Sequence, residues 1–266
     1  MGMTRRSRRK TGGRWIRYLV TVLAALLAAF FGFFFVSGYV QEGAAPTAPA
    51  AQVALATKGG NSTPAVGSET PAWETIPAYS GRPYAVLEGN RPRFSKALLS
   101  RKNAFYQFTP RDALGRCGTA VGRLGPELLP KGKRQPIGMV KPSGWQLSKY
   151  SFVDGKYLYN RCHLIAFQLC GENANRLNLI TGTRYFNVIG MLPFENRVAD
   201  YIRNTRHHVL YQVTPVYRGQ DLVARGVVME AWSVEDEGKG VHFHVFVYNV
   251  QPGVVINYAD GTNHAA

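Results

Sequence analysis

The fold is decided by the stretch Tyr159-Asn160-Arg161-Cys162-His163-Leu164-Ile165, which follows the dipeptide Asp154-Gly155. Asp-Gly between apolar runs is typical of a tight hairpin turn, so we predict a short strand over residues 156–160 and an ordered segment after it. Residues two apart on a strand point to the same face. On a strand, the side chains of Arg161 and His163 would therefore point the same way.

A helix is predicted next in the chain. Residues 177–181 are apolar and β-branched at their end, which indicates an extended segment. From residue 183 to about residue 204, large apolar residues keep a rough helical spacing. Pro193 predicts a break or a first-turn position near Leu192. Eight residues make a little over two helical turns, so Asn187 and Glu195 are expected roughly on one face.

The last third of the sequence predicts an antiparallel meander. Apolar and β-branched residues fill 208–217, 222–234 and 241–250, and turn residues separate the three runs. Residues 241–248 alternate with a period of two, as on a strand. Residues 111–129 are interpreted as mixed helix and loop, broken by prolines. Together these patterns predict an α+β domain with a central antiparallel sheet over residues 76–262.

The N-terminal part predicts a membrane segment and a linker. Residues 1–17 form a basic head, and residues 18–40 carry no charge and are long enough to cross a bilayer as a helix. Basic residues on the N-terminal flank keep that end in the cytoplasm, so the domain is expected outside it. An uncleaved anchor is favoured over a cleaved signal segment and secretion, because a typical signal-peptide core is shorter. Residues 41–75 have the composition of a flexible linker.

The charge balance indicates a polyanionic partner. The 266 residues include 32 Lys and Arg against 16 Asp and Glu, a formal net charge of +16. Seven of the 32 basic residues lie in the head, so 25 remain against 16 acidic groups. Nucleic acid or an anionic membrane surface would suit this excess, and solubility is the plainer explanation.

Three cysteines, Cys117, Cys162 and Cys170, suit an oxidising compartment without requiring a disulfide. A bridge from Cys117 to Cys162 would hold the His163 segment to an upstream one, and three separate thiols are the alternative. Because paired Cys-x-x-Cys motifs are absent from the sequence, a structural zinc site is not expected.

The residues between 160 and 204 suit metal-assisted phosphodiester hydrolysis. This reaction needs a base that is neutral near pH 7, a cation that neutralises developing charge, and basic side chains that hold phosphate. Histidine suits the first task. Hard divalent metals prefer oxygen ligands and keep much of their water, so one amide or carboxylate can hold them. His163, Asn187, Glu195 and Arg161 are residues of these types.

Three motifs in this order resemble the DNA/RNA non-specific endonucleases, the ββα-metal nucleases. Residues 159–165 resemble the Asp-Arg-Gly-His signature of that family, residues 178–187 its Asn-x8-Asn segment, and residues 191–196 the start of its acidic helix. The likeness extends over roughly residues 76–260 and is nearest to the branch of bacterial DNA-entry and extracellular nucleases. It implies a ββα-metal finger motif in the domain.

The resemblance also implies roles. His163 would be the general base, and Asn187 the sole direct protein ligand of Mg²⁺, or of Mn²⁺ in its place. Glu195 would hydrogen-bond metal-bound water, Arg161 would support the site or the phosphate, and Asn178 would be a scaffold residue. DNA and/or RNA would be cut without sequence preference, leaving 5′-phosphate and 3′-hydroxyl ends. No small-molecule cofactor is expected, and a protein inhibitor is left open.

The sequence differs from the family at the position of a phosphate-binding arginine. Ala199 occupies the position at which the family often carries an arginine. Arg134, Arg197 and Arg203 are the candidates to replace it.

Two departures from the family signature leave other functions open. Asn160 stands where the commonest signature has Asp, and Cys162 where it has Gly. An amide keeps hydrogen-bonding capacity but loses the charge, and a Cβ restricts the backbone. The chain could therefore be a nucleic-acid-binding receptor with impaired catalysis, or a cell-envelope module that meets anionic wall polymers.

Overall fold

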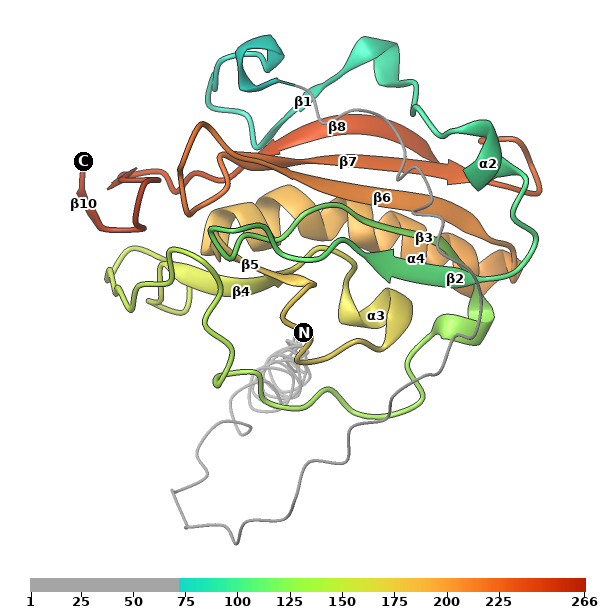
Figure 1. The fold of residues 1–266 in the computed structure, drawn as a ribbon, viewed down its shortest axis with the longest axis horizontal. Coiled ribbons are helices and arrows are strands. Elements are labelled where there is room, and N and C mark those ends of the chain that lie inside the picture. Colours follow the sequence, from blue (N-terminus) through green and yellow to red (C-terminus); the bar gives the residue numbers. More distant parts are fainter. Residues whose placement is uncertain (1–71) are drawn as a thin grey trace, which may run out of the picture. The chain divides into compact units, whose positions relative to one another are not determined.

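The computed structural model describes residues 72–266, and an antiparallel sheet of six strands forms their centre (Figure 1). Its strands lie in the order β1 (Tyr84–Val86), β8 (His242–Tyr248), β7 (Gly226–Ser233), β6 (Val209–Val216), β3 (Ala120–Leu124) and β2 (Phe105–Phe108). The predicted meander is confirmed as β6, β7 and β8. Each of these strands pairs antiparallel with the next.

Strand β3 corrects the prediction of mixed helix and loop over residues 111–129. Its five residues are all buried, so they show no alternation of apolar and polar side chains. Gly122 lets β2 approach closely, because a Cβ at this position would lie 2.6 Å from the main-chain oxygen of Phe105. A strand buried on both faces has no period that distinguishes it from an irregular buried segment.

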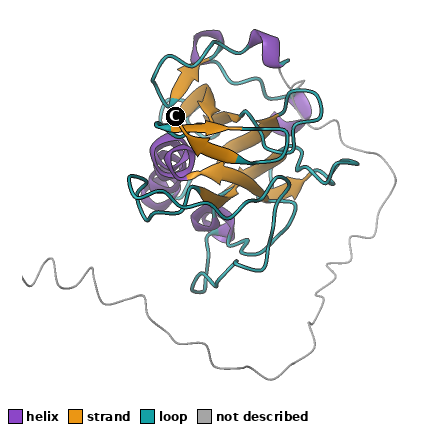
Figure 2. Cartoon of the chain, turned by 90° about the vertical axis from the view of Figure 1, so that its left-hand side faces the viewer, coloured by secondary structure: helices purple, strands orange, loops and turns teal. Residues whose placement is uncertain are grey.

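Both faces of the sheet are covered. On one face, Tyr211, Met229 and Phe243 belong to the main hydrophobic core, together with residues of the long helix α4 (Leu192–Thr205). Figure 2 shows α4 nearly end-on beside the strands. On the other face, Val228 and Phe246 form a smaller core with the segment that begins at Trp73.

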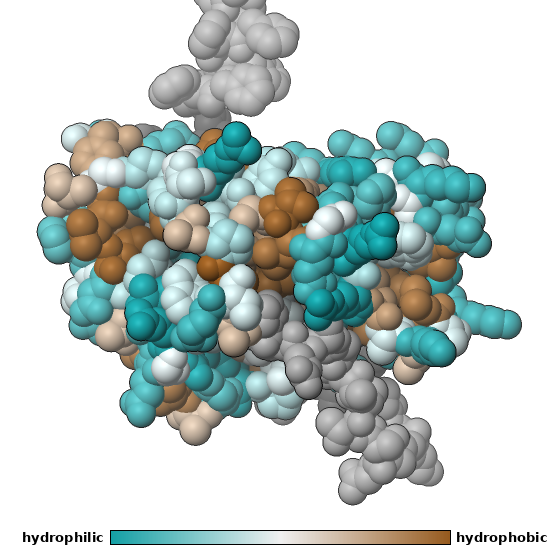
Figure 3. Space-filling view, turned by 90° about the horizontal axis from the view of Figure 1, so that it is seen from above, coloured by the Kyte–Doolittle hydropathy of each residue, from teal (hydrophilic) through white to brown (hydrophobic). Residues whose placement is uncertain are grey.

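Short elements precede and link the strands. They are η1 (Trp73–Thr75), η2 (Glu88–Asn90), α2 (Lys96–Leu99) and η3 (Pro126–Leu128). Seen from above (Figure 3), the surface of the domain is mostly polar with separate apolar patches. Val86 and Leu99 are among the exposed apolar residues of the domain.

A two-stranded unit lies apart from the main sheet. β4 (Tyr159–His163) pairs antiparallel with β5 (Leu179–Thr183), and α3 (Phe167–Cys170) lies between them in the chain. The buried side chain of Asn249, just after β8, bonds to this unit and to the segment that leads into β7. It accepts from the amide of Thr183 at 2.9 Å and donates to the carbonyls of Thr181 and Ala224 at 3.1 and 2.9 Å. This side chain ties the two sheets together.

The predicted helix over residues 183–204 begins later and in a different form. Thr183 ends β5, and residues Phe186–Met191 form a π-helix (η4) that leads into α4. The amide of Leu192 bonds to the carbonyl of Asn187, five residues earlier. Pro193 follows in the first turn of α4, which agrees with the predicted break or first-turn position near Leu192. β9 (Val254–Ile256) and β10 (Asn263–Ala265) pair near the C-terminus.

The predicted basic head, the apolar run over residues 18–40 and nearly all of the predicted linker lie outside the described residues. Within residues 72–266, the helices are too short or too polar to cross a membrane. The described part of the predicted linker includes η1, where Trp73 packs edge-on against Phe246 with a centroid separation of 6.1 Å. All three cysteines are buried free thiols, so the structure contains no bridge from Cys117 to Cys162.

Candidate active site

The strand β4 brings Arg161 and His163 to one pocket, in agreement with the prediction that their side chains point the same way. The pocket has a volume of about 390 Å³. Asn187 from η4 and Glu195 from α4 line it as well. Its remaining lining residues are Arg134, Ala166, Phe167, Gln168, Arg184, Val188, Leu192 and Asn196. Side chains from β4, from α3 and from the residues that follow β5 through η4 into α4 therefore converge on one hollow.

His163 is held as a neutral imidazole with a defined tautomer. Burial lowers its pKa, and the nearby positive charge of Arg134 lowers it further. Its Nε2 lies 2.8 Å from the main-chain oxygen of Asn173. A carbonyl only accepts, so Nε2 carries the proton and Nδ1 keeps its lone pair. His163 is thus prepared to accept a proton through Nδ1.

The side-chain oxygen of Asn187 is available to a ligand. Asn160 Oδ1 accepts from Arg184 at 3.4 Å and from Asn187 Nδ2 at 3.3 Å. Because arginine is only a donor, the oxygen of Asn160 must face it, and Asn187 must then offer its amino group to that oxygen. This orientation leaves Asn187 Oδ1 for the pocket. Asp154 in turn holds Arg184, with a separation of 2.8 Å.

Glu195 is a buried carboxyl without a hydrogen-bond donor among the described residues. Burial raises its pKa to about 8, and the positive charge of Arg134 opposes this only in part. Two residues eight apart on an ideal α-helix lie about 80° apart around its axis. The wider turn of η4 reduces that angle, so Asn187 and Glu195 both reach the pocket.

The side chains present fit a hard divalent cation. Glu195 is a buried carboxyl whose charged form a nearby cation would stabilise, and Asn187 offers an oxygen ligand in the same pocket. Mg²⁺ prefers oxygen ligands and keeps several waters. Among residues 72–266, no group of three or more His, Cys, Asp or Glu side chains is placed to hold a metal. A metal ion held mainly by protein side chains needs such a group, whereas an ion that keeps most of its water ligands does not need one.

A family model described as DNA/RNA non-specific endonuclease matches residues 100–235, just over half of the chain. The chain belongs to the DNA/RNA non-specific endonuclease family. The match includes β4, β5 and α4, and with them every residue that lines the pocket.

Relatives of known name agree with this membership. A deoxyribonuclease of Streptococcus dysgalactiae subsp. equisimilis is 36% identical over 110 residues, which cover 40% of this chain and 32% of that protein. The chain thus spans about a third of the length of the curated relative that it matches.

Solved structures share the fold. NucA from Streptococcus agalactiae, with a magnesium ion bound, superposes with a TM-score of 0.63 at 24% identity, over 73% of this chain and 94% of that one. The Sda1 nuclease, with a bound zinc ion, gives 0.53 at 28% identity, over 61% and 82%.

The arginines that the sequence suggested as site residues do not all line the pocket. Arg134 lines the pocket from the loop before β4. Arg161 donates to the carbonyls of Val140 and Gly138 and stacks on Trp145 at 4.0 Å, so it also holds the neighbouring loop.

The two arginines of α4 do not line the pocket. The Arg197 guanidinium donates to the carbonyl of Gly240 at 3.4 Å. Arg203 contacts Asp200 at 3.5 Å and Gln168 at 3.4 Å, and only Gln168 belongs to the pocket wall.

The sequence patterns did not identify Arg184 as a residue of the site. It lines the pocket and orients Asn160, and it lies three residues before Asn187 within the predicted Asn-x8-Asn segment. An arginine so close to a candidate metal ligand is the signal that could have found it. The carbonyl of Asn173 was also missed, because any residue supplies a main-chain oxygen and the sequence carries no signal for it.

The two departures from the signature have structural explanations. Asn160 accepts two hydrogen bonds that orient Arg184 and Asn187. Cys162 is fully buried in a strand and does not have a positive φ, so glycine is not needed there. Gly182, on the paired strand, leaves room for its sulfur, since a Cβ at Gly182 would lie 2.6 Å from it.

Asn178 links the two strands of the unit. Its Oδ1 accepts from the amide of Ile165 at 2.8 Å, and its Nδ2 donates to the carbonyl of Ile165 at 2.9 Å. The side chain is fully buried. These bonds hold the segment that follows His163 against the start of β5.

Proposed function

We propose that this chain is a metal-dependent nuclease that hydrolyses phosphodiester bonds of DNA and/or RNA without sequence preference, by internal cuts. The observation that carries the proposal is the single pocket in which a neutral histidine, an available amide oxygen and a buried carboxyl meet three arginines. Family membership and the name of the deoxyribonuclease relative support it.

The residues divide the chemistry between them. Nδ1 of His163 removes a proton from the attacking water, whose oxygen forms the new bond to phosphorus. The bond from phosphorus to the 3′ oxygen breaks, and that oxygen takes up a proton, which leaves 5′-phosphate and 3′-hydroxyl ends. Arg134 and Arg184 line the pocket with positive charge that binds phosphate oxygens. Arg161 supports the loop beside them.

Asn187 would hold a divalent cation, Mg²⁺ or Mn²⁺, with Glu195 accepting hydrogen bonds from its water. When bound, the cation neutralises charge on the phosphate and on the leaving oxygen. The magnesium ion bound to NucA supports the choice of metal. Because the raised pKa of Glu195 reflects an uncompensated buried carboxyl, a cation in the pocket would favour its charged form.

We place this activity outside the cytoplasm, with residues 18–40 as an anchor or a signal segment. The uncharged run with its basic flank supports this location. A solved neighbour described as an extracellular endonuclease has a TM-score of 0.51 at 21% identity.

The test is digestion of supercoiled plasmid and of RNA by the purified full-length chain, with Mg²⁺ and with EDTA. Mg²⁺-dependent conversion to open-circular and linear plasmid, followed by fragments, is expected, because internal cuts relax the circle first. Binding of DNA without any metal-dependent cutting would overturn the proposal and favour the impaired receptor.

A further inference from the structure

A second hollow adjoins the catalytic pocket and is larger, at about 760 Å³. The two share Arg134, Arg161, Arg184 and Asn187 in their walls. The two hollows therefore lie on either side of these four side chains. A nucleic-acid strand bound in the catalytic pocket can continue into the second hollow.

The wall of this hollow is cationic. Lys141 joins the three shared arginines, and its lining residues include no carboxylate. Asp154, which does not line the hollow, forms an ion pair with Arg184. Such a concentration of positive charge suits a polyanionic strand, and the same charges border the catalytic pocket. The remaining lining residues are Ile137, Trp145, Leu147, Tyr157, Tyr159 and Asn160.

The apolar part of the wall is exposed. Tyr157 is 46% exposed and Leu147 is 74% exposed, although both are large apolar groups. Lys149 lies over one face of the Tyr157 ring, with its Nζ 4.7 Å from the ring centroid. Exposed apolar side chains that gather within a cationic hollow indicate a binding surface rather than packing.

Trp145 is held in place by a braced turn. Its amide bonds to the carbonyl of Pro142 at 3.2 Å. Ser143 is tied on both sides, because its hydroxyl donates to the carbonyl of Leu222 at 2.6 Å and its own carbonyl accepts from Thr181 at 2.8 Å. Gly144 has a φ of +63°, a conformation that favours glycine. The indole is thus a rigid part of the wall.

We propose that this hollow binds an unpaired nucleotide adjacent to the scissile phosphate, with its base on the surface of Tyr157, Leu147 and Trp145 and its phosphate on the arginines. The inference rests on the proposed nuclease function. Stacking on aromatic rings is tolerant of sequence, because every base has a π-face. In a duplex the base faces are covered by their neighbours, so the rings of this hollow have no base face on which to stack. The hollow therefore favours a single strand over a duplex.

The experiment measures binding without cleavage. Full-length chain with the substitution His163→Ala is titrated, in EDTA, into a short single-stranded oligodeoxynucleotide that carries one 2-aminopurine, and into the same sequence as a duplex. Tyr157→Ala, added to this background, is expected to weaken single-strand binding by about tenfold. It should leave duplex binding nearly unchanged. Tyr157→Phe keeps the ring and should bind like the parent.

The control is Tyr79→Ala, which removes a tyrosine of similar exposure (41%) that does not line this hollow. Equal binding by Tyr157→Ala and the parent, or an equal loss with single strand and duplex, would overturn the inference. Trp145→Ala is the second variant, with an unchanged melting temperature as the check on its fold. Plasmid cutting by the unsubstituted chain is scored separately. Cutting with no effect of the Tyr157 variants on binding refutes this inference alone, and absence of cutting while single-strand binding still depends on Tyr157 refutes the nuclease proposal alone.

Discussion

Nε2 of His163 lies 2.8 Å from the main-chain oxygen of Asn173, and this contact decides which nitrogen of the imidazole can accept a proton. Asn173 lies ten residues later, in the loop between α3 and β5. The loop thus sets the tautomer of a residue that the strand β4 presents to the pocket.

His163→Ala is expected to lower the cleavage rate by about 100- to 10,000-fold, the usual contribution of a general base. The initial rate of plasmid nicking at saturating Mg²⁺ measures it. His207→Ala is the matched control, since His207 is exposed and bonds to Tyr201 at 3.3 Å, away from the pocket. Cutting that persists in His163→Ala would identify another residue as the base.

The acid limb of the pH–rate profile is expected below the ordinary histidine value of about 6.5. The base must be neutral, and burial lowers the pKa of His163, so activity is retained as pH falls until that lowered pKa is reached. The dependence of kcat/KM on pH, at fixed ionic strength, checks this. An acid limb centred well above 6.5 would contradict a neutral buried histidine as the base.

Asn187→Ala is expected to raise the Mg²⁺ concentration needed for half-maximal activity and to lower the maximal rate, because the amide oxygen in the pocket is lost. Rates over a Mg²⁺ titration measure both effects. Asn204→Ala, on the exposed surface of α4, is the control. An unchanged Mg²⁺ requirement in Asn187→Ala would rule out this side chain as the ligand.

Glu195→Gln is expected to stabilise the metal-free protein and to reduce its activity. The pKa of Glu195 in the folded chain is raised to about 8, so the unfolded chain binds fewer protons between that value and about 4.5. Stability therefore falls as pH rises through this window, by on the order of 3 kcal/mol at pH 7.

Thermal unfolding in EDTA measures this effect. The gain of Glu195→Gln over the parent should be large at pH 7 and should vanish below about pH 4.5, where both states are protonated. A gain that is the same at both pH values would show that burial of charge is not its cause.

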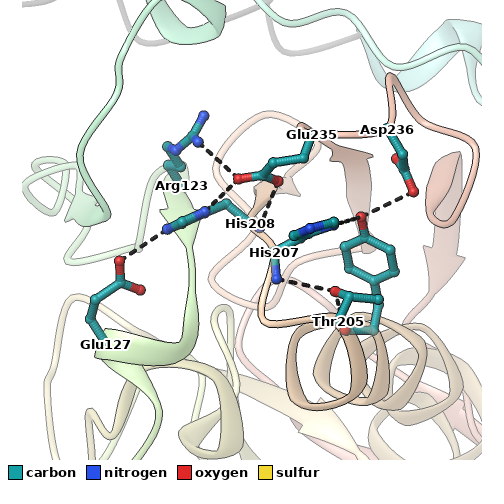
Figure 4. Close-up of polar contacts among 8 residues, drawn as sticks. Arg123, Glu127, Thr205, His207, His208, Glu235 and Asp236 are labelled. Atoms are coloured by element: carbon teal, nitrogen blue, oxygen red, sulfur yellow. Dashed lines mark hydrogen bonds and ion pairs between the residues drawn. The ribbon is translucent and has the colours of Figure 1, made fainter.

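Glu235 stabilises the far end of the sheet in a cluster that Figure 4 shows. It accepts from the imidazole of His208 at 2.6 Å, from the amide of His208 at 2.8 Å and from Arg123 at 3.2 Å. Burial opposes its ionisation, but the hydrogen bonds from His208 outweigh burial and lower its pKa. A lowered carboxyl pKa contributes stability above about pH 4.5, and that stability is lost as pH falls through the folded value.

Glu235→Gln is therefore expected to lower the free energy of unfolding by about 1–2 kcal/mol at pH 7. Urea unfolding at pH 7 and at pH 3 tests it, with the difference smaller at pH 3. Glu237→Gln, two residues away and exposed, is the control. Equal effects of the two substitutions would show that the contacts of Glu235 with His208 and Arg123 do not stabilise the fold.

Local patterns predicted several parts of the molecule. The period of two over residues 241–248 predicted β8. The spacing of Arg161 and His163 predicted that their side chains point the same way, and both line one pocket. β3 could not be predicted in this way. Its five residues are buried on both sides, and only pairing with β2 and β6, from distant parts of the chain, makes them a strand.

The candidate site divides in the same manner. The sequence by itself determined the types and order of the residues, because histidine, asparagine and glutamate at these spacings suit metal-assisted hydrolysis and match a family order. Only the tertiary structure decided how they are used. The tautomer of His163 depends on the carbonyl of Asn173, and the orientation of Asn187 depends on Asn160. The raised pKa of Glu195 depends on burial among distant segments, which no local sequence pattern encodes.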